Sequence, residues 1–164
     1  MLRPNLRVER VWDVDLASLR ARGIKGLILD LDNTLVDWNR WEVRDRVKRW
    51  AQEARRAGMR CCIASNTRSV DRTKAVAEQV GAQWITSAGK PRRKGCLRAM
   101  ESMGTAPPET AVIGDQIFTD ILAGNRLGLA TILVGPLSSV DFPGTKIARL
   151  LERLLGRWLY AKGW

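Results

Sequence analysis

The sequence predicts an α/β fold in three layers, with a central parallel sheet of about five strands between helices. Two features support this prediction: short apolar runs alternate with longer amphipathic segments, and most amphipathic segments stop at a glycine. This alternation is typical of successive strand and helix units, whose strands pair in parallel. With 164 residues and 45% hydrophobic composition, the chain is long enough for one buried core. We therefore expect a single domain over residues 1–164.

The expected strands are short and apolar, as strands buried on both faces should be. Each of the first four is followed by a segment with helical spacing that ends before a glycine, the residue that most readily closes a helix. We expect the strands at 26–29, 60–64, 82–85, 110–113 and 130–134. We expect the helices from about 42 to 57 and at 70–80, 94–103, 119–127 and 145–160.

The amino-acid composition limits the catalytic mechanisms and the partners that the protein can have. The sequence has no histidine, which removes Ser/His/Asp triads, Cys/His pairs and phosphohistidine intermediates. Acid and base roles are therefore left to carboxylates or lysine. Lys and Arg number 28 against 17 Asp and Glu, which gives a net charge of +11. Such a charge should attract anionic partners, among them anionic lipids, nucleic acids and small phosphates.

The sequence also bears on the compartment. Its three cysteines show neither the even count of a disulfide framework nor the spacing of a zinc site, so we expect buried thiols in a reducing environment. No apolar run reaches the roughly 18 residues that a membrane span needs. The first residues also lack the apolar stretch of a signal peptide. We expect a cytoplasmic protein.

Carboxylates gather where two of the predicted strands end. Asp30 and Asp32 directly follow 26–29, and Asp115 and Asp120 follow 110–113. Ligands of an open α/β sheet bind outside the carboxyl ends of its strands. Carboxylates that converge there form an all-oxygen site suited to Mg²⁺. The alternatives are a solvated acidic turn at Asp30 and Asp32, and an ordinary acid in the first turn of a helix at Asp120.

Phosphate-binding groups follow the two other strands. Ser65 and Asn66 end 60–64, and Lys90 follows 82–85 in a Gly-Lys-Pro segment. Hydroxyl and backbone N–H groups at a helix start can hold a phosphate, and a lysine can neutralise its oxygens. Each group also has a simpler explanation, since Ser65 could only cap a helix and Lys90 could be a solvated loop residue.

One segment suggests a different mechanism. Cys62 and Arg68 have the C-x5-R spacing of cysteine phosphatases. Cys62, however, lies within an apolar strand with no group nearby to activate a thiolate, so we expect it to be structural. The sequence contains neither a Walker A loop nor a Gly-x-Gly-x-x-Gly loop.

Together the four polar segments resemble the motifs of the haloacid dehalogenase (HAD) superfamily, which are D-x-D-x-T/V, a strand-end Ser or Thr, a Lys and a G-D-x-x-x-D-type motif. The corresponding segments of this chain are Asp-Leu-Asp-Asn-Thr-Leu, Ser-Asn-Thr, Gly-Lys-Pro and Gly-Asp-Gln-Ile-Phe-Thr-Asp. They resemble more narrowly the bacterial YqeG family, which is similar to phosphatidylglycerophosphate phosphatases. The resemblance implies a Rossmann-like HAD fold and a Mg²⁺-dependent phosphomonoester hydrolase.

The resemblance also implies roles. Asp30 would attack phosphorus to form an aspartyl-phosphate, and Asp32 would protonate the leaving group and then activate water. The remaining roles fall into three groups. Lys90 would act in catalysis and also bind phosphate. The other residues that would bind phosphate are Thr34, Ser65 and Asn66. Mg²⁺ would be held by Asp30, Asp115 and the backbone carbonyl of Asp32, with Asp120 in the outer shell.

The spacing of the motifs leaves no room for a cap domain, and by analogy capless relatives act on large substrates. An anionic lipid such as phosphatidylglycerophosphate is therefore the expected substrate, with soluble phosphomonoesters as the alternative. The amphipathic, Arg-rich segment 145–160 either packs on the domain or lies at the inner face of the cell membrane. Trp38 and Trp41 either line the site entrance or pack on the first helix. A nucleic-acid or ribosome partner is less expected, because the basic residues are spread along the chain.

Overall fold

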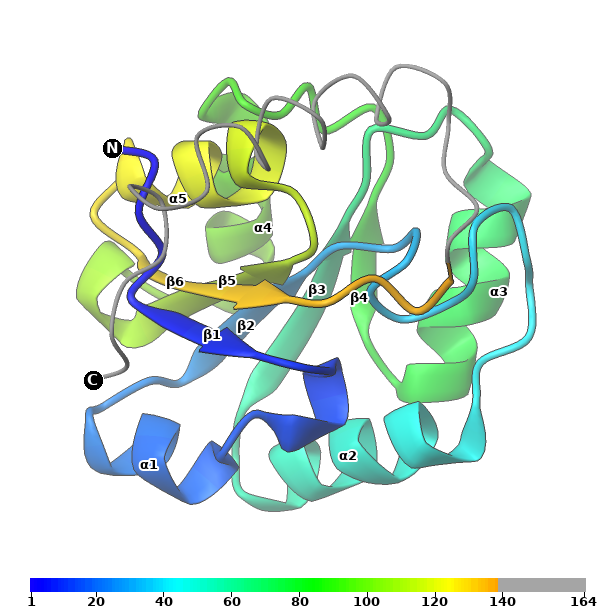
Figure 1. Cartoon of the computed structure of the whole chain (residues 1–164), viewed down its shortest axis with the longest axis horizontal. Helices are drawn as coiled ribbons and strands as arrows, with labels where there is room; N and C mark the ends of the chain where they lie inside the picture. The colour runs from blue at the N-terminus through cyan, green and yellow to red at the C-terminus, as the bar shows by residue number, and fades with distance from the viewer. Residues whose placement is uncertain (139–164) are drawn as a thin grey trace.

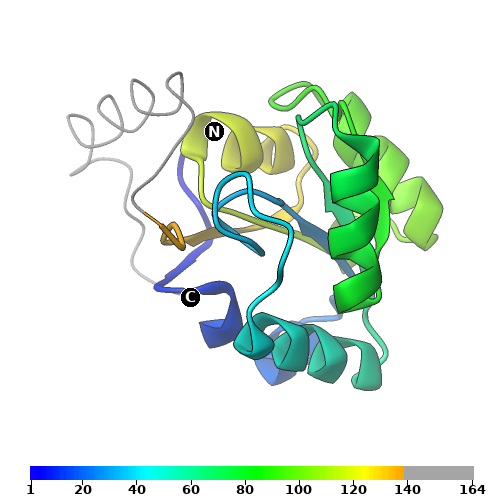
Figure 2. The same ribbon diagram turned by 90° about the vertical axis from the view of Figure 1, so that its right-hand side faces the viewer.

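The computed structural model describes residues 1–138, which form a six-stranded, fully parallel sheet between two layers of helices (Figures 1 and 2). The strand order is β1-β6-β5-β2-β3-β4. The strands are β1 (Leu6–Val8), β2 (Gly26–Leu29), β3 (Arg60–Ala64), β4 (Gln83–Ile85), β5 (Thr110–Gly114) and β6 (Ala130–Val134). The predicted α/β class is confirmed. The helix predicted at 145–160 lies outside the described residues.

The helices cover both faces of the sheet. Buried side chains of α1, α2 and α3 pack on one face, and those of α4 and α5 pack on the other. The bounds are α1 (Leu16–Ala21), α2 (Asp45–Arg56), α3 (Val70–Val80), α4 (Lys94–Met103) and α5 (Leu122–Asn125), with short helical turns at Val11–Asp13, Pro107–Glu109 and Ile117–Ile121.

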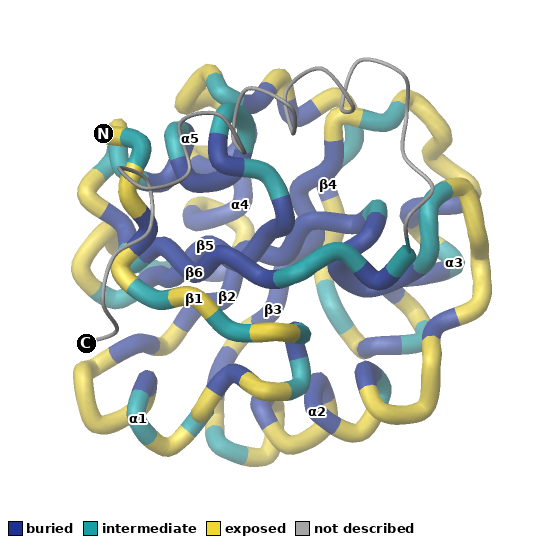
Figure 3. The backbone as a smooth tube through the Cα atoms, viewed as in Figure 1, coloured by how far each residue is buried: buried dark blue, intermediate teal, exposed yellow. Residues whose placement is uncertain are grey.

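Strand β2 shows why the sequence forms a covered sheet. All four of its residues are buried; Leu27 and Leu29 join the core under α1 to α3, while Ile28 joins the core under α4 and α5. Successive side chains of a strand point to opposite faces, so a continuous apolar run needs cover on both sides. Figure 3 shows the buried strands at the centre and exposed positions along the outer helices.

The order of the strands places the site. From β2 the chain passes to β3 and β4 on one side, and then crosses to β5 on the other side of β2. The carboxyl ends of β2 and β5 therefore meet at a topological switch point, where open α/β sheets bind ligands. Asp30 lies at this point, and its N–H donates to the carbonyl of Ile113 at 2.9 Å.

The sheet has one more strand in residues 1–138 than the sequence predicts. The additional strand, β1, pairs in parallel with β6, with Leu6 opposite Ile132. Next to it, the Asn5 N–H donates to the hydroxyl of Thr131 at 3.1 Å, and the Thr131 N–H donates to Oδ1 of Asn5 at 2.8 Å. β1 has only three residues, so its own pattern is too short to predict a strand. The contacts with a distant part of the chain define it.

The helix predicted from about residue 42 begins at Asp45 instead. The backbone before it is bonded to side chains of α3. The carbonyl of Arg40 accepts from Arg72, the carbonyl of Trp41 accepts from Gln79, and the N–H of Val43 donates to Gln79. Side chains of α3 thus satisfy the hydrogen bonds of these backbone groups, which therefore do not enter a helix.

The helix predicted at 119–127 also differs. It begins earlier, as a π-helical turn at Ile117–Ile121, and continues as α5 to Asn125. The carbonyl of Gln116 accepts from the N–H groups of Asp120 at 3.0 Å and Ile121 at 3.3 Å, which widens the first turn. Such wide turns are rare and occur frequently at functional sites.

Between the strands of residues 1–138 the chain forms loops and the helices named above, and no cap is evident among them. None of the helices in this part has both the length and the apolar composition needed to cross a membrane.

Gly124 tests the packing of α5 on the sheet. A Cβ at this position would lie 2.3 Å from Cγ1 of Val112 and 2.7 Å from Cγ2 of Thr131. Alanine favours a helix over glycine by about 1 kcal/mol, but overpacking a core costs about 1 to 3 kcal/mol. We therefore expect Gly124→Ala to lower the free energy of unfolding, as measured by urea titration of tryptophan fluorescence. A stabilised Gly124→Ala protein would show that α5 has room to move away from the sheet.

Candidate active site

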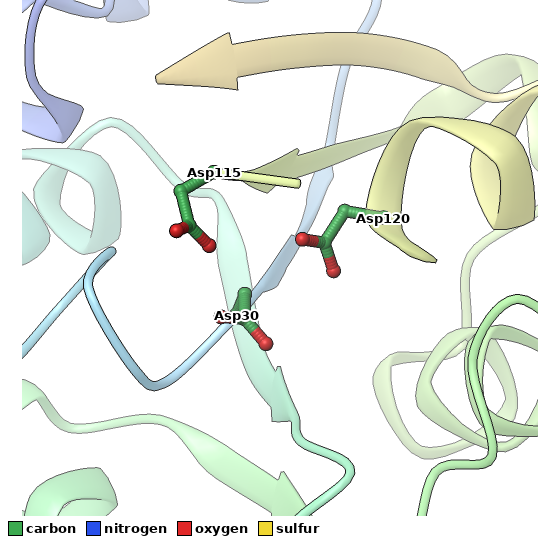
Figure 4. Close-up of side chains that lie close together, drawn as sticks. All are labelled: Asp30, Asp115 and Asp120. Carbon is green, nitrogen blue, oxygen red and sulfur yellow. The ribbon is translucent and has the colours of Figure 1, made fainter. Parts of the chain in front are cut away.

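Three buried aspartates converge at the switch point (Figure 4). Asp30 follows β2, Asp115 follows β5, and Asp120 lies in the π-helical turn. One carboxylate oxygen from each lies within 4.8 Å of the others. Residue 114 must be glycine for this approach, because a Cβ there would lie 2.3 Å from Cγ of Asp120. The π-helical turn and Gly114 thus bring the third carboxylate to the first two.

Lys90 supplies the positive charge of the cluster. Its ammonium donates to Oδ1 of Asp30 at 2.7 Å and to Oδ1 of Asp120 at 2.5 Å. Its backbone is held by Asn66, whose side chain donates to the Lys90 carbonyl at 2.9 Å and accepts from the Lys90 N–H at 2.8 Å. The Lys90 side chain is 2% exposed, so it is a component of the site and not a solvated loop lysine.

Burial sets the electrostatics. Loss of solvation raises the pKa of Asp30 to about 7; Lys90 opposes this rise, and the charge of Asp120 adds to it. Burial alone would lower the pKa of Lys90, but the carboxylates of Asp120 and Asp30 raise it above its ordinary value. The lysine is therefore charged, and the carboxylates around it still exceed it in number.

The donor set fits a hard divalent cation. Three carboxylates with one ammonium leave uncompensated negative charge in a buried space, and carboxylate oxygens are the ligands that Mg²⁺ takes. A divalent cation beside these oxygens would also favour their ionised forms. The resemblance to the HAD superfamily implies that Asp30, Asp32 and Asp115 hold the metal and that Asp120 lies in its outer shell. The structure groups Asp30 with Asp115 and Asp120, so the part of Asp32, through its backbone carbonyl, stays a prediction.

The Asp32 carboxylate faces an arginine that the sequence analysis missed. Arg72 of α3 donates from Nη1 to Oδ2 of Asp32 at 3.2 Å and from Nη2 to Oδ1. The N–H of Asn39 donates to the same Oδ1 at 3.0 Å. Arg72 is 4% exposed and shares the buried stripe of α3 with Val76 and Val80, at spacings of four residues. That spacing is the feature of the sequence that could have marked it as a buried arginine.

A cavity of about 470 Å³ opens over the cluster. It brings together five of the residues predicted for the site, and it adds four that were not predicted for it. Its lining is Asp30, Asp32, Asn33, Trp38, Ser65, Asn66, Thr67, Lys90, Gln116 and Thr119. Of the two tryptophans left open, Trp38 lines the cavity and Trp41 is exposed. Thr34 is fully buried and outside this lining, so its contact with phosphate stays a prediction.

Cys62 lies in the interior, as its place in β3 predicts. Its side chain is fully buried in the core under α4, and burial raises the pKa of its thiol. Arg68, the other member of the C-x5-R spacing, is exposed. A buried thiol with a raised pKa is a poor nucleophile, so the geometry does not support a cysteine mechanism.

The fold and the site together define a class of protein. A parallel α/β sheet presents carboxylates, a lysine and hydroxyl groups at its switch point, around a cavity. Phosphoryl transfer requires charge neutralisation and in-line positioning above all, and groups of these types are suited to both tasks. The class is that of hydrolases acting on phosphate esters.

Comparisons with known proteins narrow the class. Residues 87–136, which include Lys90, Asp115 and Asp120, match a family model described as HAD-hydrolase-like. The chain is 38% identical over 160 residues to the Bacillus subtilis protein named "Probable phosphatase YqeG", covering 98% of this chain and 92% of that protein. The chain therefore belongs to the YqeG family of HAD-like hydrolases and is a phosphatase. The resemblance expected from the motifs is confirmed.

Two further similarities extend the comparison. The chain is 31% identical over 165 residues to chloroplastic phosphatidylglycerophosphate phosphatase 1 of Chlamydomonas reinhardtii, covering 94% of this chain and 61% of that longer protein. Its fold is similar to that of the cobalt-bound deoxy-D-mannose-octulosonate 8-phosphate phosphatase of Haemophilus influenzae. That structure matches with a TM-score of 0.52 and 15% identity, over 84% of this chain and 92% of the other.

Cys62 provides a test of the nucleophile. Cys62→Ala should lower the free energy of unfolding by about 1 kcal/mol, a typical effect of a core truncation, and leave turnover of an aryl phosphate unchanged. Cys96→Ala, in the same buried cluster, is the matched control. A folded Cys62→Ala protein without activity, beside an active Cys96→Ala protein, would restore the cysteine mechanism.

Proposed function

We propose that this phosphatase hydrolyses a phosphomonoester with Mg²⁺ and an aspartyl-phosphate at Asp30, and that its substrate is an anionic lipid phosphate. The observation that supports the chemistry is the cluster of Asp30, Asp115, Asp120 and Lys90 beneath the cavity. In this cluster one carboxylate can meet phosphorus, while the ammonium of Lys90 beside it can neutralise phosphoryl oxygens.

The proposed reaction has two displacements. An Asp30 oxygen attacks phosphorus and forms a new P–O bond, while the ester P–O bond breaks and the leaving oxygen takes a proton from Asp32. Water then attacks the phosphorus of the aspartyl-phosphate and gives a proton to Asp32, while the bond between the Asp30 oxygen and phosphorus breaks. This step releases inorganic phosphate and restores the Asp30 carboxylate. Mg²⁺, when bound, would supply positive charge to the phosphoryl oxygens.

The surrounding groups have supporting roles in this proposal. Lys90, Ser65 and Asn66 line the cavity beside Asp30, where they can bind phosphoryl oxygens. Asp30, Asp115 and Asp120 offer the carboxylate oxygens that would hold the cation. Thus the chain itself offers both a nucleophile and the neutralising charge that a transferring phosphoryl group needs.

A basic rim beside the cavity supports an anionic lipid as the substrate. We define it as Arg68, Arg92, Arg93, Lys94 and Arg126, which are all exposed. Its two loops, 66–69 and 90–94, contain no acidic residue and are joined by the Asn66 to Lys90 hydrogen bonds. Arg126 is held against the second of these loops, since it donates to the carbonyl of Pro91 at 2.9 Å. Such a rim would attract a surface of anionic headgroups.

Two other observations favour a lipid. The Chlamydomonas relative is named for phosphatidylglycerophosphate, a lipid phosphate. Within residues 1–138 no cap domain covers the cavity, so a headgroup could reach it from a membrane surface. We therefore include peripheral contact with the inner face of the cell membrane in the proposal. Soluble phosphomonoesters are the alternative that the second test below distinguishes.

Asp30 provides the test of the chemistry. Asp30→Asn should abolish turnover, because an amide is a poor nucleophile and removes a charged ligand, while its similar shape should preserve the fold. Turnover of an aryl phosphate with Mg²⁺, with and without EDTA, measures the effect. Circular dichroism checks folding.

Two controls accompany this test. Asp37→Asn, which changes an aspartate outside the cavity lining, should retain activity. Beryllium fluoride should be trapped only when both Asp30 and Mg²⁺ are present, as followed by ¹⁹F NMR. Substantial hydrolysis by pure, folded Asp30→Asn would falsify the assigned nucleophile.

Vesicle binding provides the test of the lipid. The wild type should co-sediment with phosphatidylglycerol-rich vesicles more than with neutral ones, and salt should weaken binding by screening. Cations near an anionic membrane contribute about 1 kcal/mol each, so changing Arg92, Arg93 and Lys94 together to Gln should weaken partitioning by roughly 100-fold. Activity on a small aryl phosphate should persist.

The control variant removes the same number of positive charges from the helices on the other face of the sheet. Arg20, Arg49 and Arg56 are exposed on α1 and α2, and their joint change to Gln should leave vesicle binding nearly intact. Equal weakening by both triple variants would indicate a response to net charge alone. Absence of wild-type binding at low salt would favour a soluble phosphomonoester as substrate.

A further inference from the structure

Arg72 makes an unusual set of contacts for a residue of a surface helix. Its guanidinium donates from both Nη atoms to the two oxygens of Asp32 and from Nε to the carbonyl of Arg40 at 2.9 Å. A planar guanidinium can direct several N–H groups at fixed angles, which a lysine ammonium cannot do. Arg72 therefore joins three segments: the turn after β2, the loop before α2, and α3.

The exposure of the two partners is unequal. The Arg72 side chain is 5% exposed, while the Asp32 side chain is 25% exposed and lines the cavity. The arginine thus holds the carboxylate from the interior and leaves part of it exposed to the cavity. Oδ1 accepts from Asn39 as well as Arg72, whereas Oδ2 has only the Arg72 contact among the hydrogen bonds to it in residues 1–138. Oδ2 is the oxygen better placed to exchange a proton with a ligand.

We infer that Arg72 is a positioning residue for the phosphatase reaction: it fixes the Asp32 carboxylate at the cavity wall, in the orientation needed for proton transfer to and from the leaving oxygen. This inference rests on the proposed function, because it gives Asp32 the proton-transfer role. Without Arg72 the Asp32 side chain could rotate about its own bonds, and the loop before α2 would lose its bond to α3. Small losses of orientation at a reacting group reduce rates strongly.

A purely structural role predicts a different result. A residue that only supports the fold affects all substrates alike, whereas one that orients a proton donor matters most when the leaving group needs a proton. Alkoxide leaving groups need that proton, and nitrophenolate leaves without it. The ratio of the two activities therefore separates the two roles.

The experiment compares an alkyl phosphate, glycerol 3-phosphate, with p-nitrophenyl phosphate. Arg72→Gln should lower kcat for glycerol 3-phosphate by about 10-fold or more, within the range of general acid catalysis, and lower kcat for p-nitrophenyl phosphate much less. KM should change little for either substrate. Arg72→Lys, which keeps the charge and loses the fork, should fall between wild type and Arg72→Gln. Equal losses on both substrates would overturn the inference.

The chain offers a matched control. Arg44 pairs with Asp37 in the same loop, with Nη2 to Oδ1 at 2.7 Å, but both residues are outside the lining of the cavity. Arg44→Gln should therefore leave the ratio of the two activities unchanged. A shift as large as that of Arg72→Gln would show that loosening of the loop, and not of Asp32, causes the effect.

A double-mutant cycle shows whether Arg72 acts through Asp32. In an Asp32→Asn background, Arg72→Gln should cause no further selective loss on glycerol 3-phosphate. An undiminished loss there would overturn the inference. The proposed function fails separately, if Asp30→Asn retains turnover. If Arg72→Gln does not fold, Arg72→Lys provides the same comparison. Guanidinium added to Arg72→Ala provides a second one, and we expect it to restore the glycerol 3-phosphate activity.

Discussion

The contact between Lys90 and the aspartates is the constraint on which the rest of the site depends. Three carboxylates cannot share a buried space without compensating charge, because burial and mutual repulsion both oppose ionisation. The ammonium of Lys90 meets two of them, and the Asn66 side chain fixes the backbone from which it extends. The loops after β3 and β4 are therefore organised around one charge.

That charge cluster can form only because the sheet has its particular order. β2 and β5 are separated by 80 residues of sequence, yet their registered pairing places Leu29 opposite Ile113, immediately before the acidic segments. The π-helical turn then brings Asp120 back towards Gly114, where only the absence of a side chain permits the approach. Topology, turn and glycine act together to produce a site with enough oxygen ligands for a divalent cation.

Arg72 adds a second layer of organisation. Asp30 is fixed by the sheet and by Lys90, whereas Asp32 has already left the strand and is held by Arg72 of α3. The two neighbouring carboxylates both line the cavity but lie in different environments, Asp30 more buried and beside an ammonium, and Asp32 more exposed and beside a guanidinium. Different environments are what allow two carboxylates to have different chemical roles.

The sequence by itself determined the α/β class, the central strands, the acidic and lysine motifs and the buried place of Cys62, because these depend on local periodicity and on motifs read along one strand end. Only the tertiary structure decided that β1 joins the sheet, that the loop before α2 is held by α3, and that Arg72 faces Asp32. Each of these depends on contacts between residues far apart in the chain, such as Leu6 with Ile132 and Asp32 with Arg72. A local sequence pattern does not show which distant residues will contact it, because those contacts form only when the chain folds.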